Sequence, residues 1–308
     1  MSTIIRRDSR ETFAATAADL VRTDPRTAIV YAEISGQYFG DVAGDVPERV
    51  INVGIREQLL VSVGAGLALS GLRSIVHTFA SFLVERPFEQ VKLDFGHQDV
   101  GGVLVSTGGA FDVSSGGRTH QSPGDVALMG TLPGWSIHLP GHADEVEAVL
   151  RRVVPGEGRH YVRVVGQQNE RPSEHVVSGR PGFEVVRRGA GGVVIAVGPT
   201  LTETLAATED LDVTVLYAVS IRPFDAHGLR AAVAQSAANV VLVEPYLAGT
   251  TSAPVSAALI DVPHRLLALG TRNVELRHYG TPSEHIRAHG LDAPSLRQSI
   301  GDFLTRGA

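Results

Sequence analysis

A glutamate at the start of a helical pattern is the first candidate for chemistry. In the run from Asn52 to Gln58, a strand pattern passes through Gly54 into an apolar helical pattern whose first turn holds Glu57. A carboxylate in that position is favourable to the helix dipole by ~0.3–1 kcal/mol, so Glu57 by itself is also explained as a structural residue. A role as acid or base requires further groups beside it.

Two aromatic residues and an arginine follow at short spacing. Phe79 and Phe82 are three residues apart, and Arg86 comes four residues after the second ring. Rings at this spacing are able to share one side of a helix, where they usually pack in a core. They are also suited to stacking on an aromatic ligand, because aromatic rings attract one another in offset and edge-to-face arrangements.

A histidine at the end of a glycine-rich loop is the third candidate. Six glycines lie between Gly101 and Gly117, and the loop continues as Arg118-Thr119-His120-Gln121. The loop lacks a lysine and a clean G-x-G-x-x-G pattern, so the glycines alone favour a flexible surface connection. Histidine titrates near neutral pH, which makes His120 a candidate acid or base, although a histidine in a loop is most often simply solvated.

The elements that must position these groups alternate between strands and helices. In the first half, strands are expected at 28–34, 49–53, 102–106, 135–139 and 160–165, and helices at 10–21, 55–69, 82–95 and 143–153. In the second half, strands are expected at 192–197, 213–217, 240–243 and 265–269, and helices at 201–208, 226–236, 251–259 and 283–289. This alternation predicts an α/β fold with two mostly parallel sheets flanked by helices. We expect domains at 1–170 and 183–308, joined by a linker at 171–182 that contains two prolines.

Composition excludes several classes of protein. The 308 residues include 43% hydrophobic and 19% charged residues, with a net charge of -6 and no basic cluster, so nucleic acid is not an expected partner. No apolar run of about 18 residues and no signal-peptide pattern is present, so we expect a cytoplasmic protein that does not bind membranes. There is no cysteine, and no G-x-x-x-x-G-K-[ST], H-E-x-x-H or G-x-S-x-G motif; no metal site is assigned to this chain.

Taken together, in this order and spacing, the three candidate segments resemble the central section of the transketolase family. That family carries a G-I-R-E-[HQ] segment, a T-F-x-x-F pair and a glycine loop that ends in [ST]-H-Q. The stretch 126–134 resembles the segment after the family's histidine. The stretches 221–225, 243–245 and 278–290 are similar to the family's C-terminal domain, especially that of deoxyxylulose-phosphate synthases. The resemblance therefore covers almost the whole chain.

The resemblance implies a thiamine diphosphate enzyme with a pyrimidine-binding domain followed by a transketolase C-terminal domain. Glu57 matches the carboxylate that contacts a pyrimidine nitrogen of the cofactor, and Phe79 and Phe82 match the rings that stack on the pyrimidine. His120 matches the family's substrate-side histidine, which makes Glu57 and His120 the expected catalytic pair. Arg118 and Gln121, on either side of Thr119-His120, are expected substrate contacts.

The other half of the family's machinery is missing. The family binds the diphosphate and Mg through a G-D-G motif in a separate N-terminal domain, and this sequence contains no G-D-G. The resemblance therefore implies that a partner chain, an N-terminal transketolase subunit, carries the diphosphate and Mg site. The cofactor would then lie between chains, in an expected α2β2 assembly.

Three substrate-side positions depart from the family. Gly108 stands where the family has a substrate-contacting histidine, and Gly116 stands where it has an acidic residue that binds sugar hydroxyls. Gly166 falls at a phosphate-gripping arginine, although Arg163 lies nearby, and Arg10 corresponds to another phosphate-contacting arginine. Sugar-phosphate recognition relies on charge-assisted contacts, so these changes predict an unphosphorylated or modified substrate.

The function expected from the resemblance is that of the C-terminal subunit of a two-component transketolase. It would transfer a two-carbon ketol unit between sugar-like carbonyl substrates, and it would be active only with its partner. The alternative is a pyruvate-decarboxylating acyl transferase of the deoxyxylulose-phosphate synthase type. A 2-oxo acid dehydrogenase β subunit and a non-catalytic paralogue also remain open.

Overall fold

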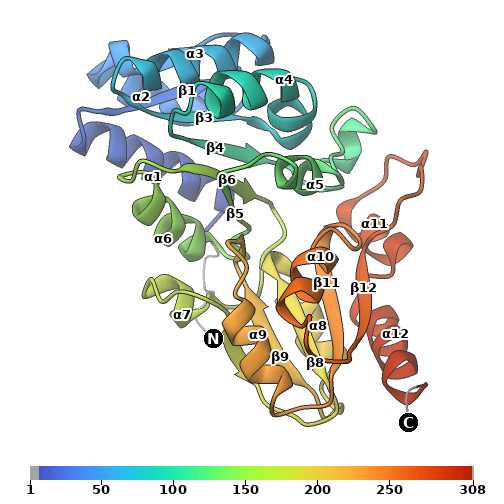
Figure 1. The fold of residues 1–308 in the computed structure, drawn as a ribbon. Helices are drawn as coiled ribbons and strands as arrows, with labels where there is room; N and C mark the ends of the chain where they lie inside the picture. Colours follow the sequence, from blue (N-terminus) through green and yellow to red (C-terminus); the bar gives the residue numbers. More distant parts are fainter. Residues whose placement is uncertain (1–6, 307–308) are drawn as a thin grey trace, which may run out of the picture.

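The computed structural model describes residues 7–306, which form two sheets with helices on both faces of each (Figure 1). The first sheet has seven strands in the order β10-β5-β6-β4-β3-β1-β2. All neighbouring pairs are parallel except the β10–β5 pair. Its strands are β1 (Thr27–Tyr31), β2 (Val50–Asn52), β3 (Arg73–Phe79), β4 (Gly102–Thr107), β5 (Trp135–His138), β6 (Arg159–Val164) and β10 (Ser220–Arg222).

Alternate residues of the central strands face opposite cores, as the two-residue period of a strand requires. Ile29 and Ile75 pack with helices on one face, whereas Val30 and Val76 pack with helices on the other. The first face is covered by α1 (Ser9–Thr23), α2 (Gly36–Asp45) and α6 (Ala143–Val153). The second face is covered by α3 (Glu57–Leu69), α4 (Phe88–Gln90), α5 (Asp125–Gly130) and the π-helical turns Ser81–Glu85 and Val91–His97.

The second sheet has five strands in the order β12-β11-β8-β9-β7. They are β7 (Glu184–Arg187), which is antiparallel to its neighbour, and the parallel strands β8 (Val193–Val197), β9 (Thr214–Ala218), β11 (Asn239–Leu247) and β12 (Arg265–Thr271). The helices are α7 (Glu174–Val177), α8 (Leu201–Ala207), α9 (Ala226–Val233), α10 (Ser252–Ala258), α11 (Pro282–His289) and α12 (Ala293–Thr305). The predicted fold class, two mostly parallel sheets flanked by helices, is confirmed.

Several elements were not predicted: β3, β7, β10, α2, α5, α12 and the short α7 inside segment 171–182. The most consequential is β3, which contains Arg73, Ser74 and His77 yet is buried along most of its length. Polar residues are tolerated in such a strand where fixed partners receive them. Arg73 donates to the carbonyls of Val153 and Val154, which is a tertiary contact that no periodicity reveals.

The two halves of the chain are joined by buried polar contacts as well as by β10. Glu145 is completely buried and accepts hydrogen bonds from the Tyr217 hydroxyl at 2.7 Å and from the backbone N–H groups of Gly141 and Ser173 at 2.8 Å each. Burial raises the pKa of the Glu145 carboxyl, and these three hydrogen bonds oppose the rise. The junction is therefore held by a satisfied polar network.

Candidate active site

The candidate residues gather where the parallel strands of the first sheet end. Phe79 at the end of β3 pairs in register with Thr107, and Thr107 pairs with Val164. Loops that follow parallel strands meet at one edge of a sheet, and this edge is where open α/β folds bind ligands. Two residues just beyond strand ends, Ser35 and Ala110, have positive φ angles of 65° and 49°, the kind of backbone strain that clusters at functional sites.

Glu57 is the first residue of α3 and is 3% exposed. Its Oε1 accepts a hydrogen bond from Nη1 of Arg86 at 2.6 Å. The guanidinium of Arg86 also lies 4.0 Å from the ring centroid of Phe82. The arginine therefore connects the buried carboxylate to the face of one aromatic ring. Arg86 was noted in the sequence but was given no role.

Phe79, Phe82 and His120 form a cluster of three rings. The ring centroids of Phe79 and Phe82 are 5.9 Å apart at an angle of 80°. His120 lies 5.5 Å from Phe79 and 5.0 Å from Phe82. Phe82 belongs to the π-helical turn Ser81–Glu85, a type of distortion that is frequent at functional sites. The structure thus brings together groups that lie about forty residues apart in the sequence.

Gly116 explains how the histidine ring reaches this position. A Cβ atom at Gly116 would lie 2.6 Å from Cγ of His120, which is closer than real contacts allow. Nδ1 of His120 lies 3.2 Å from the Gly116 carbonyl oxygen and 3.0 Å from the Thr119 hydroxyl. An acidic side chain at position 116 is therefore incompatible with this placement of the ring.

The Arg118 side chain contacts protein groups, whereas the side-chain Nε2 of Gln121 is buried without a hydrogen-bond partner among the described residues. Nη1 of Arg118 donates to the Gln121 carbonyl at 3.0 Å, and its Nε lies 3.3 Å from the Glu275 carboxylate. Glu275 belongs to residues 272–281, here called the C-terminal strap, which run along the glycine loop. The strap also places the ring of Tyr279 against Gly117 and the carbonyl of Gly280 within 3.0 Å of the Ser114 hydroxyl. The expected substrate contacts of Arg118 and Gln121 remain predictions.

Sequence reasoning missed a buried chain of hydrogen bonds that includes His77, two residues before Phe79. Nε of Arg10 donates to the Ser35 hydroxyl at 2.7 Å, and that hydroxyl lies 2.8 Å from Nε2 of His77. Nδ1 of His77 is 2.8 Å from the Val105 carbonyl, so Nδ1 carries the proton and Nε2 accepts from Ser35. Burial lowers the pKa of His77 to about 3, so its ring stays neutral. The position of His77 two residues before Phe79 was the available signal.

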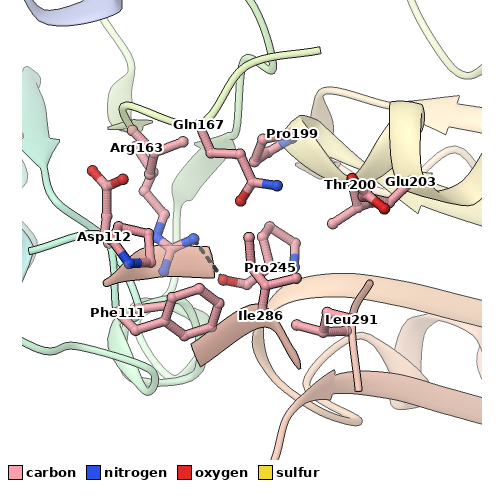
Figure 2. Close-up of a pocket in the computed structure, with 14 residues that line it drawn as sticks. Phe111, Asp112, Arg163, Gln167, Pro199, Thr200, Glu203, Pro245, Ile286 and Leu291 are labelled. Carbon is pink, nitrogen blue, oxygen red and sulfur yellow. Dashed lines mark hydrogen bonds between the residues drawn. The ribbon is translucent and has the colours of Figure 1, made fainter. Parts of the chain in front are cut away.

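A mostly apolar pocket with a few charged residues lies between the two halves of the chain (Figure 2). Figure 2 shows Asp112 and Arg163 on one side of it and Glu203 on the other, with Phe111 and Leu291 among the apolar residues below. Arg163 pairs with the buried Asp125 at 2.8 Å and donates to the Pro245 carbonyl at 2.9 Å.

Metal-binding clusters and membrane spans are both absent from the described part of the chain. Within residues 7–306, no group of three or more histidine, aspartate or glutamate side chains is placed to hold a metal ion. None of the helices in this range is long and apolar enough to cross a membrane.

Comparison with known proteins places this arrangement in a family. Residues 6–170 match the transketolase pyrimidine-binding domain, and residues 182–296 match the transketolase C-terminal domain. The first match spans more than half of the chain, and the chain belongs to the transketolase family. The resemblance found in the sequence is therefore confirmed.

Several relatives are known. The chain is 52% identical to an uncharacterized 33.6 kDa protein of the fasciation locus of Rhodococcoides fascians, over 95% of this chain and 93% of that protein. It is 28% identical to one of the subunits of the apulose-4-phosphate transketolase of Phocaeicola vulgatus, over 96% and 97% of the two chains. It is 27% identical to the 1-deoxy-D-xylulose-5-phosphate synthase of Oleidesulfovibrio alaskensis, of which it spans 48%. A solved split-gene transketolase, an inactive β4 tetramer, has the same fold, with a TM-score of 0.84, 24% identity and coverage of 97% and 98%.

Proposed function

We propose that this chain is the pyrimidine-binding, C-terminal subunit of a two-component, thiamine diphosphate-dependent transketolase. With its partner it transfers a two-carbon ketol unit between sugar-like carbonyl substrates that are unphosphorylated or modified. The observation that carries the proposal is the meeting of Glu57, Phe82 and His120 at one edge of the sheet, through Arg86 and direct ring contacts. A relative of nearly the same length is itself one subunit of a transketolase, which supports a split enzyme.

The residues present fit a pyrimidine ring. The guanidinium of Arg86 is planar, bears N–H groups, packs on Phe82 at 4.0 Å and donates to Glu57 at 2.6 Å. These are the two contacts expected of a pyrimidine that stacks on Phe82 and shares a proton with the carboxylate. The Arg86 side chain is 42% exposed, so it is able to yield this place to a ligand.

Within such a complex, each residue would have a separate task. When bound, thiamine diphosphate supplies an electron sink for the two-carbon unit. Glu57 would hold a proton at a pyrimidine nitrogen, and its burial limits exchange of that proton with water. Phe79 and Phe82 would orient the ring and exclude water. Nδ1 of His120 faces the Gly116 carbonyl, which leaves Nε2 as the nitrogen that would bind a substrate oxygen or move its proton.

The partner would be an N-terminal transketolase subunit that carries the diphosphate and Mg, in an α2β2 assembly. Beside Glu57, Ile55 is 73% exposed and Leu59 is 43% exposed. Large apolar side chains that flank a buried carboxylate are suited to cover by a second chain. This surface supports a cofactor site between subunits.

The proposal is tested by isolating the complex from the native host and assaying it with thiamine diphosphate, Mg, a ketose and pyruvate. We expect a partner that carries G-D-G, and consumption of the ketose without release of carbon dioxide. Release of carbon dioxide from pyruvate would favour the acyl transferase alternative. A chain that has no such partner, binds no cofactor and shows no turnover would refute the proposal and favour a non-catalytic paralogue.

A further inference from the structure

Asp112 lies in the glycine loop, between Gly108 and His120, and its carboxylate turns back to the end of β6. Its Oδ2 accepts the backbone N–H of Gly166 at 3.0 Å, and the backbone of Gln167 is a second partner. A Cβ atom at Gly166 would lie 3.3 Å from Oδ1 of Asp112. The carboxylate therefore occupies the space beside Gly166 and uses the N–H groups that follow β6.

Asp8 is a second carboxylate close enough to act on Asp112. Asp8 caps α1 through hydrogen bonds of 2.9 Å from the N–H groups of Arg10 and Glu11, and its charge raises the pKa of Asp112, although burial is the larger cause. Asp8 and Asp112 are thus two carboxylates that repel each other at this edge.

In the pocket on the other side of Asp112, Arg163 is the one cation among the lining residues that the structure describes. Arg163 lies close enough to lower the pKa of Asp112, but it is paired with Asp125 at 2.8 Å. The other charged side chain of that pocket, Glu203, is a second carboxylate (Figure 2). Arg163 and the backbone N–H groups of Gly166 and Gln167 therefore favour the ionised form of Asp112, against the effect of burial, which raises its pKa.

We propose that Asp112 is a specificity-determining residue, which makes the site accept a substrate with a free terminal hydroxyl and reject the corresponding phosphate ester. This inference rests on the proposed transketolase function. Phosphate sites are built from arginines and free backbone N–H groups. Here the N–H groups of Gly166 and Gln167 already bind a carboxylate, which would repel a phosphate carrying about -1.5 to -2 charges.

A hydroxyl group, unlike a phosphate, would be attracted to this carboxylate. An ionised carboxylate only accepts hydrogen bonds, so it binds a hydroxyl that donates one. Like charges placed against each other are a common means of excluding the wrong ligand. Asp112 would therefore select a neutral, hydroxyl-bearing end in two ways, by attraction and by repulsion. This choice would set the chain apart from the relatives named for phosphorylated sugars.

The test compares a five-carbon ketose with its 5-phosphate in the reconstituted complex. The variants are Asp112→Asn, which keeps the shape and removes the charge, and the surface control Asp210→Asn. We expect the wild type to favour the unphosphorylated ketose in kcat/KM by about tenfold or more, and Asp112→Asn to reduce that preference by about tenfold, mainly through a lower KM for the phosphate ester. Asp210→Asn should leave the ratio unchanged.

Two results would overturn the proposal: a wild-type preference for the phosphate ester, or an unchanged ratio in Asp112→Asn. If neither ketose is turned over, the proposed function fails, and the binding of inorganic phosphate to the separate chain still decides the role of Asp112. Calorimetry should then show binding to Asp112→Asn about tenfold tighter than to the wild type. Equal affinities would contradict the inference.

Discussion

Glu57 and Glu145 are both buried and both lie in the first turn of a helix, but they are held in different ways. Glu145 accepts from a tyrosine hydroxyl and two backbone N–H groups, all of them fixed by the fold. Glu57 accepts from Arg86, whose side chain is 42% exposed. A carboxylate with fixed donors has a structural role, whereas one held by an exposed side chain is able to change partner. Burial alone does not separate the two roles.

The largest effect that this comparison predicts is loss of turnover in Glu57→Gln. The amide keeps the size of the side chain but cannot share a proton with the cofactor as a carboxylate does, so turnover of the reconstituted complex should fall by about 10³-fold or more. The measurement is kcat with saturating ketose, thiamine diphosphate and Mg. The melting temperature of the chain should change little.

Exposed Glu209 provides the control, since Glu209→Gln should retain turnover and stability. If Glu57→Gln turned over at near the wild-type rate, its assignment as a catalytic residue would be wrong. If it lost its fold instead, Glu57 would belong with Glu145 as a structural residue.

Glu145→Ala is expected to lower the stability of the chain and to leave turnover per folded molecule unchanged. This change leaves the Tyr217 hydroxyl and the N–H groups of Gly141 and Ser173 without their acceptor. Buried polar groups that lose a partner are costly, so the free energy of unfolding should fall by about 3 kcal/mol. Urea titration of the separate chain measures it, and Tyr217→Phe, which removes one of the three donors, should cost about 1 kcal/mol.

Turnover per folded molecule separates this variant from Glu57→Gln, because the three hydrogen-bond donors to Glu145 lie outside the set of candidate catalytic residues. A small change in unfolding free energy, below about 0.5 kcal/mol, would mean that the junction network contributes little. Glu145 would then not be the structural residue that its contrast with Glu57 requires.

A histidine pair at the same junction predicts acid sensitivity. The rings of His138 and His160 stack at 5.3 Å, with His138 also bonded to Ser220 of β10 at 2.8 Å. Burial lowers the pKa of His138 to about 3 and that of His160 to about 4, with Arg152 acting in the same direction. Both lie below the ordinary value of 6.5, so the unfolded chain takes up protons first as the pH falls.

The free energy of unfolding should therefore decrease as the pH falls from about 6.5 toward about 4, by about 1.4 kcal/mol per pH unit for each such histidine. Urea titrations at about pH 7 and about pH 5 measure the slope. In His160→Gln the slope should be smaller, since one of the two groups no longer titrates. Equal slopes in the wild type and the variant would show that His160 takes up its proton at the same pH in the folded and the unfolded chain, which would contradict the prediction.

The fold class followed from local pattern, because most buried strands are apolar and most helices are amphipathic. The helix predicted at 143–153 has those bounds in the structure. The strand β3 was not predicted from local pattern, because its Arg73 and His77 are polar residues whose partners lie on other elements. The strand β10 did not follow either, because its three residues pair with β5 of the other half of the chain.

In the candidate site, too, some features were predictable from the sequence and others depend on tertiary contacts. Through the family resemblance, the order of Glu57, Phe79, Phe82 and His120 along the chain was enough to predict a shared site, and the structure brings the three rings together. The pairing of Arg86 with Glu57 was not predictable, since it depends on how the π-helical turn directs the arginine. The contact of Asp112 with Gly166 joins residues 54 positions apart, and no local pattern encodes it.

The smallest effect is expected at the C-terminal strap, where the contacts with the glycine loop are exposed. Arg118 and Glu275 are each 52% exposed, and such an ion pair contributes about 0–1 kcal/mol because water screens it. Glu275→Gln should therefore change the free energy of unfolding by less than about 0.5 kcal/mol. Because Arg118 is a predicted substrate contact, the loss of its ion pair with Glu275 should shift KM by about two- to threefold in the reconstituted complex and leave kcat unchanged. A loss of more than about 2 kcal/mol would instead show that the strap is a structural contact of the same kind as Glu145.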